Sequence, residues 1–139
     1  MLEHFKFHHI GYVTDSITNF SMEYVRGGYS VSDVFIDDIQ RTKICFLYKK
    51  DNPVIELVEP LDEKSSVNKI LKKNGVCPYH ICYETDSINT DFDLMCEQGY
   101  IPLFRPVKAV AFGDRLICYF YKKEIGFIEL LNSRMEIAK

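Results

Sequence analysis

The stretch from His9 to Tyr29, HIGYVTDSITNFSMEYVRGGY, aligns without a gap with the stretch from His80 to Tyr100, HICYETDSINTDFDLMCEQGY. Nine of the twenty-one positions are identical, where chance at ordinary composition would give roughly one or two. The chain therefore contains an internal duplication. The identical pairs are His9/His80, Ile10/Ile81, Tyr12/Tyr83, Thr14/Thr85, Asp15/Asp86, Ser16/Ser87, Ile17/Ile88, Gly28/Gly99 and Tyr29/Tyr100.

The similarity resumes further along the chain, after a shift of two residues. There ICFLYKKDNPVIEL (44–57) aligns with ICYFYKKEIGFIEL (117–130), and each stretch carries a matched glutamate, Glu56 and Glu129. Each half of the chain therefore begins with a histidine and ends with a glutamate.

Each half has the pattern of a strand, a helix and three further strands. Residues 8–13 alternate as in a strand, and Asp15 and Ser16 offer N-cap oxygens for a helix that ends at Gly27 and Gly28. The helix carries apolar residues at helical spacing: Ile17, Phe20, Tyr24 and Val25 in the first half and Ile88, Phe92 and Met95 in the second. The later strands are expected at 29–36, 42–48 and 54–58, and then at 100–105, 115–121 and 126–131.

The chain of 139 residues is long enough for one domain with its own core. We expect a single domain over 1–133, with module one at 5–60 and module two at 78–133. The connector, 61–77, should hold a short capped helix that ends at Asn74 and Gly75, and 134–139 should be a frayed tail.

Composition excludes several classes of protein. A net charge of -3 argues against nucleic-acid binding, which needs clustered Lys and Arg. No apolar stretch approaches the roughly 20 residues that span a bilayer, and the first residues lack the pattern of a secretion signal. The five cysteines contain no CxxC arrangement, so we expect reduced, mostly buried thiols in a cytoplasmic protein, with a thiolate metal site or a redox pair as the alternative.

Side chains alternate between the two faces of a strand, so each glutamate lies on a definite face of its strand. His9 and His80 occupy equivalent positions in their strands and should therefore point to equivalent faces. If the helix of each half covers one sheet face, the other face can line a cavity. Pairing the halves about a pseudo-twofold axis would then bring His9, His80, Glu56 and Glu129 together, a set that suits a borderline divalent ion such as Zn, Co, Ni or Mn. A buried carboxylate needs a partner, although duplication can also copy residues that no longer bind an ion.

Four short motifs resemble the metal-ligand motifs of the vicinal oxygen chelate superfamily, which includes glyoxalase I and methylmalonyl-CoA epimerase. They are His9-Ile10-Gly11, Ile55-Glu56-Leu57, His80-Ile81-Cys82 and Ile128-Glu129-Leu130. The resemblance covers about residues 5–133. It implies an α+β fold of two tandem βαβββ modules, whose mixed sheets form an open cup around one divalent ion held by the four named residues.

Within this superfamily, the stretch IELVEPLDEKSSVNKILKKNG (55–75) looks most like methylmalonyl-CoA epimerases. The chain departs from some of these enzymes at Ile44, where they carry an acid. The resemblance implies a metal-dependent epimerase or isomerase that acts on a 2-carboxyacyl thioester of the methylmalonyl-CoA type through a metal-chelated enolate. A small-molecule CoA or glutathione thioester is thus the expected partner, and a homodimer is an expected assembly.

The expected catalytic groups are carboxylates. We expect Glu129, ahead of Glu56, to loosen from the ion and to move the α-proton, because a cation lowers the pKa of a carboxylate that stays bound to it. Lys108 and Arg115 flank the middle strands of the second half and are candidates to bind a substrate carboxylate or phosphate. His4 and His8 have no counterpart in the second half and are expected to be structural or surface groups.

Two other functions fit the same residues. A glyoxalase I-like lactoylglutathione lyase would use the same His/Glu/His/Glu set on hemithioacetals. A non-catalytic protein of this fold would bind or sequester a small molecule in its cup. An iron oxygenase is less favoured, because such enzymes use two histidines and one carboxylate.

Overall fold

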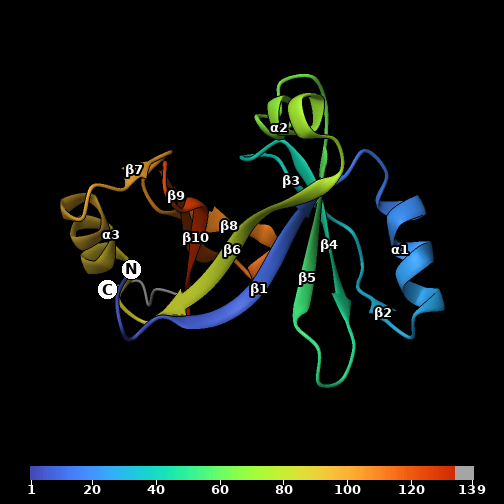
Figure 1. The fold of residues 1–139 in the computed structure, drawn as a ribbon, viewed down its shortest axis with the longest axis horizontal. Coiled ribbons are helices and arrows are strands. Elements are labelled where there is room, and N and C mark those ends of the chain that lie inside the picture. The colour runs from blue at the N-terminus through green and yellow to red at the C-terminus, as the bar shows by residue number, and fades with distance from the viewer. Residues whose placement is uncertain (134–139) are drawn as a thin grey trace. The chain divides into compact units, whose positions relative to one another are not determined.

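The computed structural model describes residues 1–133, which hold ten strands, three α-helices and one 3-10 turn (Figure 1). The first part of the chain contains β1 (Lys6–Val13), α1 (Ile17–Arg26), β2 (Ser30–Val31), β3 (Phe35–Asp37), β4 (Thr42–Tyr48), β5 (Val54–Pro60) and α2 (Val67–Asn74). The second part contains β6 (Cys77–Thr85), α3 (Ile88–Glu97), β7 (Ile101–Pro102), β8 (Val107–Ala109), η1 (Val110–Phe112), β9 (Arg115–Lys122) and β10 (Gly126–Asn132). This order confirms the predicted α+β class and the repeated pattern of elements.

The chain forms two compact units. The first unit spans His9–Tyr79, and the second combines Met1–His8 with the residues from His80 onward. Strands β1 and β6 therefore each begin in one unit and continue in the other. The predicted tail at 134–139 lies outside the described residues.

The two units repeat the same sheet topology. In the first unit the strand order is β2, β4, β5, β1, with β3 also paired to β4. In the second it is β7, β9, β10, β6, with β8 also paired to β9. In both, the last strand lies parallel to the first strand of the half and antiparallel to the strand before it. The duplication seen in the sequence is thus a duplication of strand pairing.

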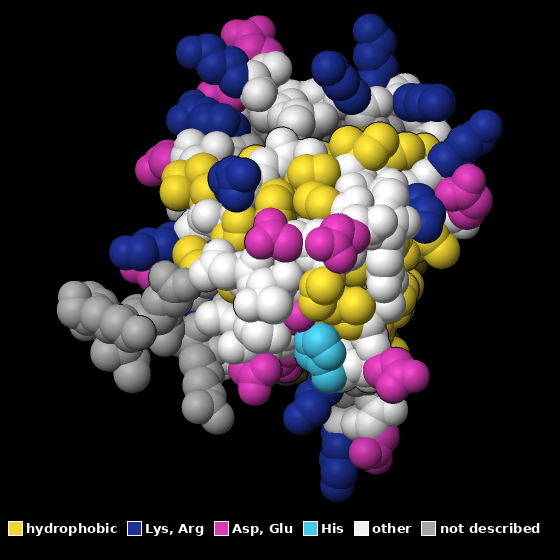
Figure 2. Space-filling view, turned by 90° about the vertical axis from the view of Figure 1, so that its left-hand side faces the viewer, with side chains coloured by type: hydrophobic (Ala, Val, Ile, Leu, Met, Phe, Trp, Pro, Cys, Tyr) yellow, Lys and Arg dark blue, Asp and Glu magenta, His cyan; other side chains and the backbone are white. Residues whose placement is uncertain are grey.

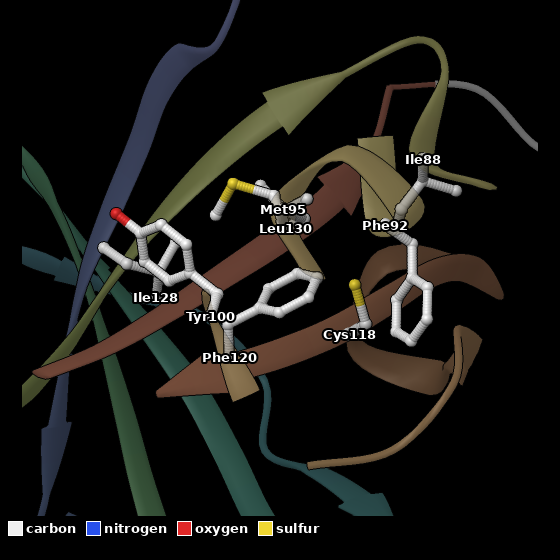
Figure 3. Close-up of a cluster of buried hydrophobic side chains, with 8 residues drawn as sticks. All are labelled: Ile88, Phe92, Met95, Tyr100, Cys118, Phe120, Ile128 and Leu130. Atoms are coloured by element: carbon white, nitrogen blue, oxygen red, sulfur yellow. The ribbon is translucent and has the colours of Figure 1, made fainter. Parts of the chain in front are cut away.

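One helix covers one face of each sheet. In the first unit, α1 packs over a buried cluster made of Ile17, Cys45, Leu47, Ile55 and Leu57. In the second unit, α3 packs over the larger cluster drawn in Figure 3: Ile88, Phe92, Met95, Tyr100, Cys118, Phe120, Ile128 and Leu130. Burying a side chain of this size contributes about 1.5–3 kcal/mol. Because the helix and its cluster bury one face of each sheet, the opposite face is left for other contacts.

Two predicted strands are shorter than the sequence pattern indicated. The run 29–36 is divided into β2 and β3, because Ser32 Oγ accepts a hydrogen bond from Phe46 N at 2.8 Å and takes the place of a regular ladder contact. The run 100–105 forms only the two residues of β7, since Pro102 and Pro106 lack the N–H that a sheet needs.

The predicted apolar stripe of α1 is correct at its first residues and wrong at Val25, which is 53% exposed. At about 100° per residue, Val25 lies some 80° around the helix from Ile17 and so falls outside the buried stripe.

The connector forms α2, which ends at Asn74 as predicted and packs Val67 against Val13 and Val58. Gly75 follows with a positive φ of 72° and donates its N–H to Leu71 O. Ser66 precedes the helix, but its side chain makes no cap hydrogen bond. The helix is therefore held by its C-terminal cap and its apolar contacts.

The surface of the described residues carries hydrophobic patches among charged side chains. Figure 2 shows such patches on one face, with Lys and Arg side chains along its upper edge. In the second unit Ile101, Ile125 and Leu103 are 63%, 52% and 48% exposed. Among the described residues, none of the helices has the length and apolar character needed to span a bilayer.

Candidate metal centre

The first unit brings His9 and Glu56 together on the sheet face that α1 leaves uncovered. His9 pairs with Val54, and Glu56 pairs with Gly11 on the neighbouring parallel strand. Because side chains alternate along a strand, His9 and Glu56 share one face. His9 Nε2 lies 3.6 Å from Glu56 Oε1, and their side chains are 0% and 1% exposed.

The second unit repeats this arrangement with His80 and Glu129. His80 pairs with Phe127, and Glu129 pairs with Cys82, so the offset between the parallel strands is the same. His80 Nε2 lies 3.1 Å from Glu129 Oε1, again with both side chains buried. The predicted parity of all four residues is thus observed within each unit.

The chemistry of each pair fits a divalent ion. Burying a carboxylate away from water costs several kcal/mol unless a cation or hydrogen bonds compensate. Each pair offers one imidazole nitrogen and one carboxylate oxygen on the same buried face, which are donor types that borderline divalent ions prefer. One pair supplies two donors, whereas a stable site commonly needs three or four protein ligands.

An aromatic ring stands beside each histidine, at a position that was not among the predicted site residues. Phe46 meets His9 with ring centroids 6.2 Å apart, and Tyr119 meets His80 at 5.2 Å, both edge to face. Phe46 and Tyr119 occupy matched positions in ICFLY (44–48) and ICYFY (117–121). The sequence offered one sign of these rings: in the two aligned segments, each aromatic residue stands ten positions before the matched glutamate.

The candidate substrate-binding residues have different surroundings. Lys108 lies on β8 and is exposed. Arg115, at the start of β9, donates from Nε to Phe112 O at 3.1 Å and lies 3.8 Å from Glu84. Arg115 thus has structural partners, and a role in substrate binding stays a prediction for both residues.

A buried carboxylate at Asp91 was also missed. Its side chain is 2% exposed and lies 2.8 Å from His4 Nε2. Ser87 Oγ donates to Asp91 at 3.1 Å, and Thr85 Oγ1 donates as well. His4 is therefore a structural group, as expected. His8 contacts the Phe112 ring at 5.7 Å.

A polar cavity of about 540 Å³ lies beside this network in the second unit. Its lining residues are His4, Lys6, Glu84, Thr85, Asp86, Ser87 and Ser133. The lining includes neither His80 nor Glu129, so the cavity is separate from the histidine and glutamate pair of that unit.

All five cysteines are free thiols. Burial raises the pKa of Cys45 to about 11, and burial also raises the pKa of Cys118, where the charge of Glu129 adds to the effect. Both thiols belong to the clusters under the helices. They are therefore core residues whose burial disfavours the thiolate form.

Comparison with known structures shows the fold. A hypothetical protein from Bacillus halodurans matches with a TM-score of 0.83 at 23% identity, over 99% of this chain and 100% of that one. Methylmalonyl-CoA epimerase from Mycobacterium tuberculosis matches with a TM-score of 0.78 at 21% identity, over 94% and 91% of the two chains.

A variant of Streptomyces coelicolor methylmalonyl-CoA epimerase, in complex with 2-nitronate-propionyl-CoA, matches with a TM-score of 0.75 at 24% identity, over 91% and 95% of the two chains. A comparison with curated protein sequences returned no match. A sequence model of the Glyoxalase/Bleomycin resistance protein/Dioxygenase superfamily matches residues 8–119. This match includes His9, Glu56 and His80, and the chain belongs to that superfamily.

Proposed function

We propose that the protein is a divalent-metal-dependent epimerase or isomerase that acts on a 2-carboxyacyl thioester of the methylmalonyl-CoA type. The observation that carries the proposal is the presence, in each unit, of a buried histidine and glutamate at matched positions on parallel strands. The similarity in fold to methylmalonyl-CoA epimerases supports the choice of substrate class.

In this proposal His9, Glu56, His80 and Glu129 hold one ion of Zn, Co, Ni or Mn. Such an ion, when bound, would stabilise negative charge that develops on the substrate oxygens as the α-proton leaves. The histidines remain fixed, since each is packed against an aromatic ring. A glutamate carboxylate takes and returns the α-proton, and Glu129 is assigned this role ahead of Glu56.

Lys108 and Arg115 are proposed to meet the anionic part of the thioester. The exposed apolar side chains of the second unit, such as Ile101 and Leu103, provide area for the proposed homodimer. The free thiols fit a reducing, cytoplasmic setting.

A glyoxalase I-like lyase is the second candidate, because the same two histidine and glutamate pairs would serve a hemithioacetal substrate. A protein that binds a small molecule without turning it over is the third. Solvent deuterium separates these functions. Wash-in at the α-carbon of methylmalonyl-CoA supports the epimerase, lactoylthioester formation from methylglyoxal and glutathione supports the lyase, and turnover of neither leaves the binding protein.

The first experiment is elemental analysis of untagged protein purified without chelator, beside His80→Ala. We expect about one divalent ion per chain in the wild type and loss of the ion in the variant. His4→Gln is the control, because it removes a histidine outside both pairs while keeping a donor for Asp91. Metal-free wild type after incubation with Zn, Co, Ni and Mn would overturn the proposal.

A further inference from the structure

The two glutamates have different neighbours across their strands. In the first unit Glu56 lies between Gly11 on β1 and Phe46 on β4, its register partners on the two sides. Glycine has no side chain, and the phenyl ring of Phe46 has no hydrogen-bonding group. The two residues in register with Glu56 therefore carry no side-chain donor, and the imidazole that lies 3.6 Å from Glu56 Oε1 comes from His9, two positions before Gly11 on β1.

In the second unit the matched row has different chemistry. Glu129 lies between Cys82 on β6 and Tyr119 on β9. Directly opposed residues of an antiparallel pair, such as Glu129 and Tyr119, have Cβ atoms about 4.5–5.5 Å apart. A thiol and a phenol, both of which can donate a hydrogen bond, thus flank Glu129.

The ring contact between Tyr119 and His80 shows how the phenol lies. His80 is on β6 and Tyr119 is on β9, with β10 between them, and the two residues are offset by two positions along the strands. Their backbones are therefore more than two strand spacings, or about 9–10 Å, apart. Their ring centroids are only 5.2 Å apart. Both side chains therefore lean across β10, over the position of Glu129.

The matched contact between His9 and Phe46 spans β5 in the same way, at 6.2 Å. Each glutamate is thus bracketed by a histidine and an aromatic ring. The two rows differ in the phenol hydroxyl of Tyr119 and in the thiol of Cys82, which stands where the first unit has Gly11. Tyr119 is also the more exposed ring, being half-buried while Phe46 is buried.

From this asymmetry we infer that Tyr119 is a positioning residue for Glu129, the carboxylate that turns away from the ion to move the substrate proton. The inference rests on the proposed function. The phenol donates a hydrogen bond to the Glu129 carboxylate in its displaced position and lowers the cost of leaving the ion. In the first unit the residue matched to Tyr119 is Phe46, whose ring carries no hydroxyl.

The first test is a double-mutant cycle on metal-free protein, with Tyr119→Phe and Glu129→Met alone and together. Tyr119→Phe keeps the ring and removes the donor, and Glu129→Met keeps the length and removes the acceptor. We expect Tyr119→Phe to lower the Tm by about 3 °C when Glu129 is present and by less than about 1 °C when it is absent. Equal shifts in both backgrounds would overturn the contact.

Tyr121→Phe is the matched control. Tyr121 lies two residues away on the same face of β9 and pairs with Phe127, whose ring it contacts at 5.1 Å. Removal of this hydroxyl should give the same Tm shift with and without Glu129.

The second test separates positioning from packing in the metal-loaded protein. We expect Tyr119→Phe to retain the ion and to lower kcat about tenfold or more, with KM for methylmalonyl-CoA changed less than about twofold. An unchanged kcat, or a loss confined to KM, would overturn the positioning role.

The two proposals fail in different ways. Absence of turnover by metal-loaded wild type would overturn the proposed reaction and, with it, the part assigned to Tyr119 in proton transfer. The metal-free cycle would still decide the contact between Tyr119 and Glu129, because it needs neither ion nor substrate.

Discussion

The same residues, Thr-Asp-Ser, precede helices α1 and α3, yet the two serines have different partners. In the first unit Ser16 Oγ accepts a hydrogen bond from Asn19 N at 3.1 Å and caps α1. In the second unit the matched Ser87 makes no side-chain cap and donates to Asp91 instead. A shared motif thus has two roles, and the residue four positions later decides between them.

That residue is Phe20 in the first unit and Asp91 in the second. Phe20 stacks on Tyr24 with ring centroids 4.9 Å apart and completes an apolar cluster. Asp91 is buried as a carboxylate with His4, Thr85 and Ser87 around it. Duplication therefore kept the strands and the sites of the helices, while the first turn of the helix changed from aromatic packing to a polar network.

The largest expected effect concerns the two cores. Phe120 and Leu47 are matched residues, both 0% exposed, and Phe120 also contacts Phe92 and Tyr100. We expect Phe120→Ala to lower the free energy of unfolding by about 3–5 kcal/mol and Leu47→Ala by about 3 kcal/mol. Urea unfolding measures both. Val25→Ala, at an exposed site, should stay within about 0.5 kcal/mol, and a Phe120→Ala effect as small as that would contradict the described core.

The next effect concerns the polar network. Asp91→Asn should lower the free energy of unfolding by about 2 kcal/mol, because it removes charge-assisted hydrogen bonds from Thr85 and Ser87 and the contact with His4. Thermal or urea unfolding reads this out. Asp93→Asn is the control on the exposed side of α3. If the two variants were equally stable, the buried carboxylate would have no special part in the second unit.

The smallest expected effect concerns the connector, whose Asp62 forms an ion pair with Arg41 of the first unit. Arg41 and Asp114 are matched residues in left-handed conformations, with φ 55° and 64°. Arg41 donates a hydrogen bond to Asp62, and this contact holds the pKa of the Asp62 carboxyl below its ordinary value. The stabilisation is therefore complete above about pH 4, the ordinary range of an aspartate, and is lost as the pH falls through the lower folded pKa.

Asp62→Asn should accordingly lower the Tm at neutral pH, and the difference from wild type should vanish in acid. The measurement is Tm against pH from 7 to 2, with Glu63→Gln as a control for the loss of one negative charge. A Tm difference that persists at pH 2 would show that the side chain acts through packing and not through its charge.

The sequence predicts the fold well because the duplication aligns two copies of each element, and the alternation at His9, Glu56, His80 and Glu129 matches the observed faces. The binding of an ion by all four residues stays a proposal. The Asp91 network was not predicted because His4 and Asp91 are 87 positions apart in the sequence. Sequence patterns of strands and helices indicate only contacts between residues close along the chain. The mismatch of Phe20 with Asp91 in the alignment was the one available hint. The break between β2 and β3 depends on Ser32 bonding to a distant strand, which a strand propensity cannot register.

The assignment of residues 1–8 to the second unit has a consequence for synthesis of the chain. Leu2, Phe5 and His4 find their contacts around α3 and the strands beneath it, which leave the ribosome long after the N-terminus. At about 5–20 residues per second, the 87 residues from Phe5 to Asp91 take roughly 4–17 seconds to make. Residues 1–8 must therefore wait for α3 and the strands beneath it before they reach the contacts of the folded structure, whereas His9–Val13 pair with β5 of their own unit.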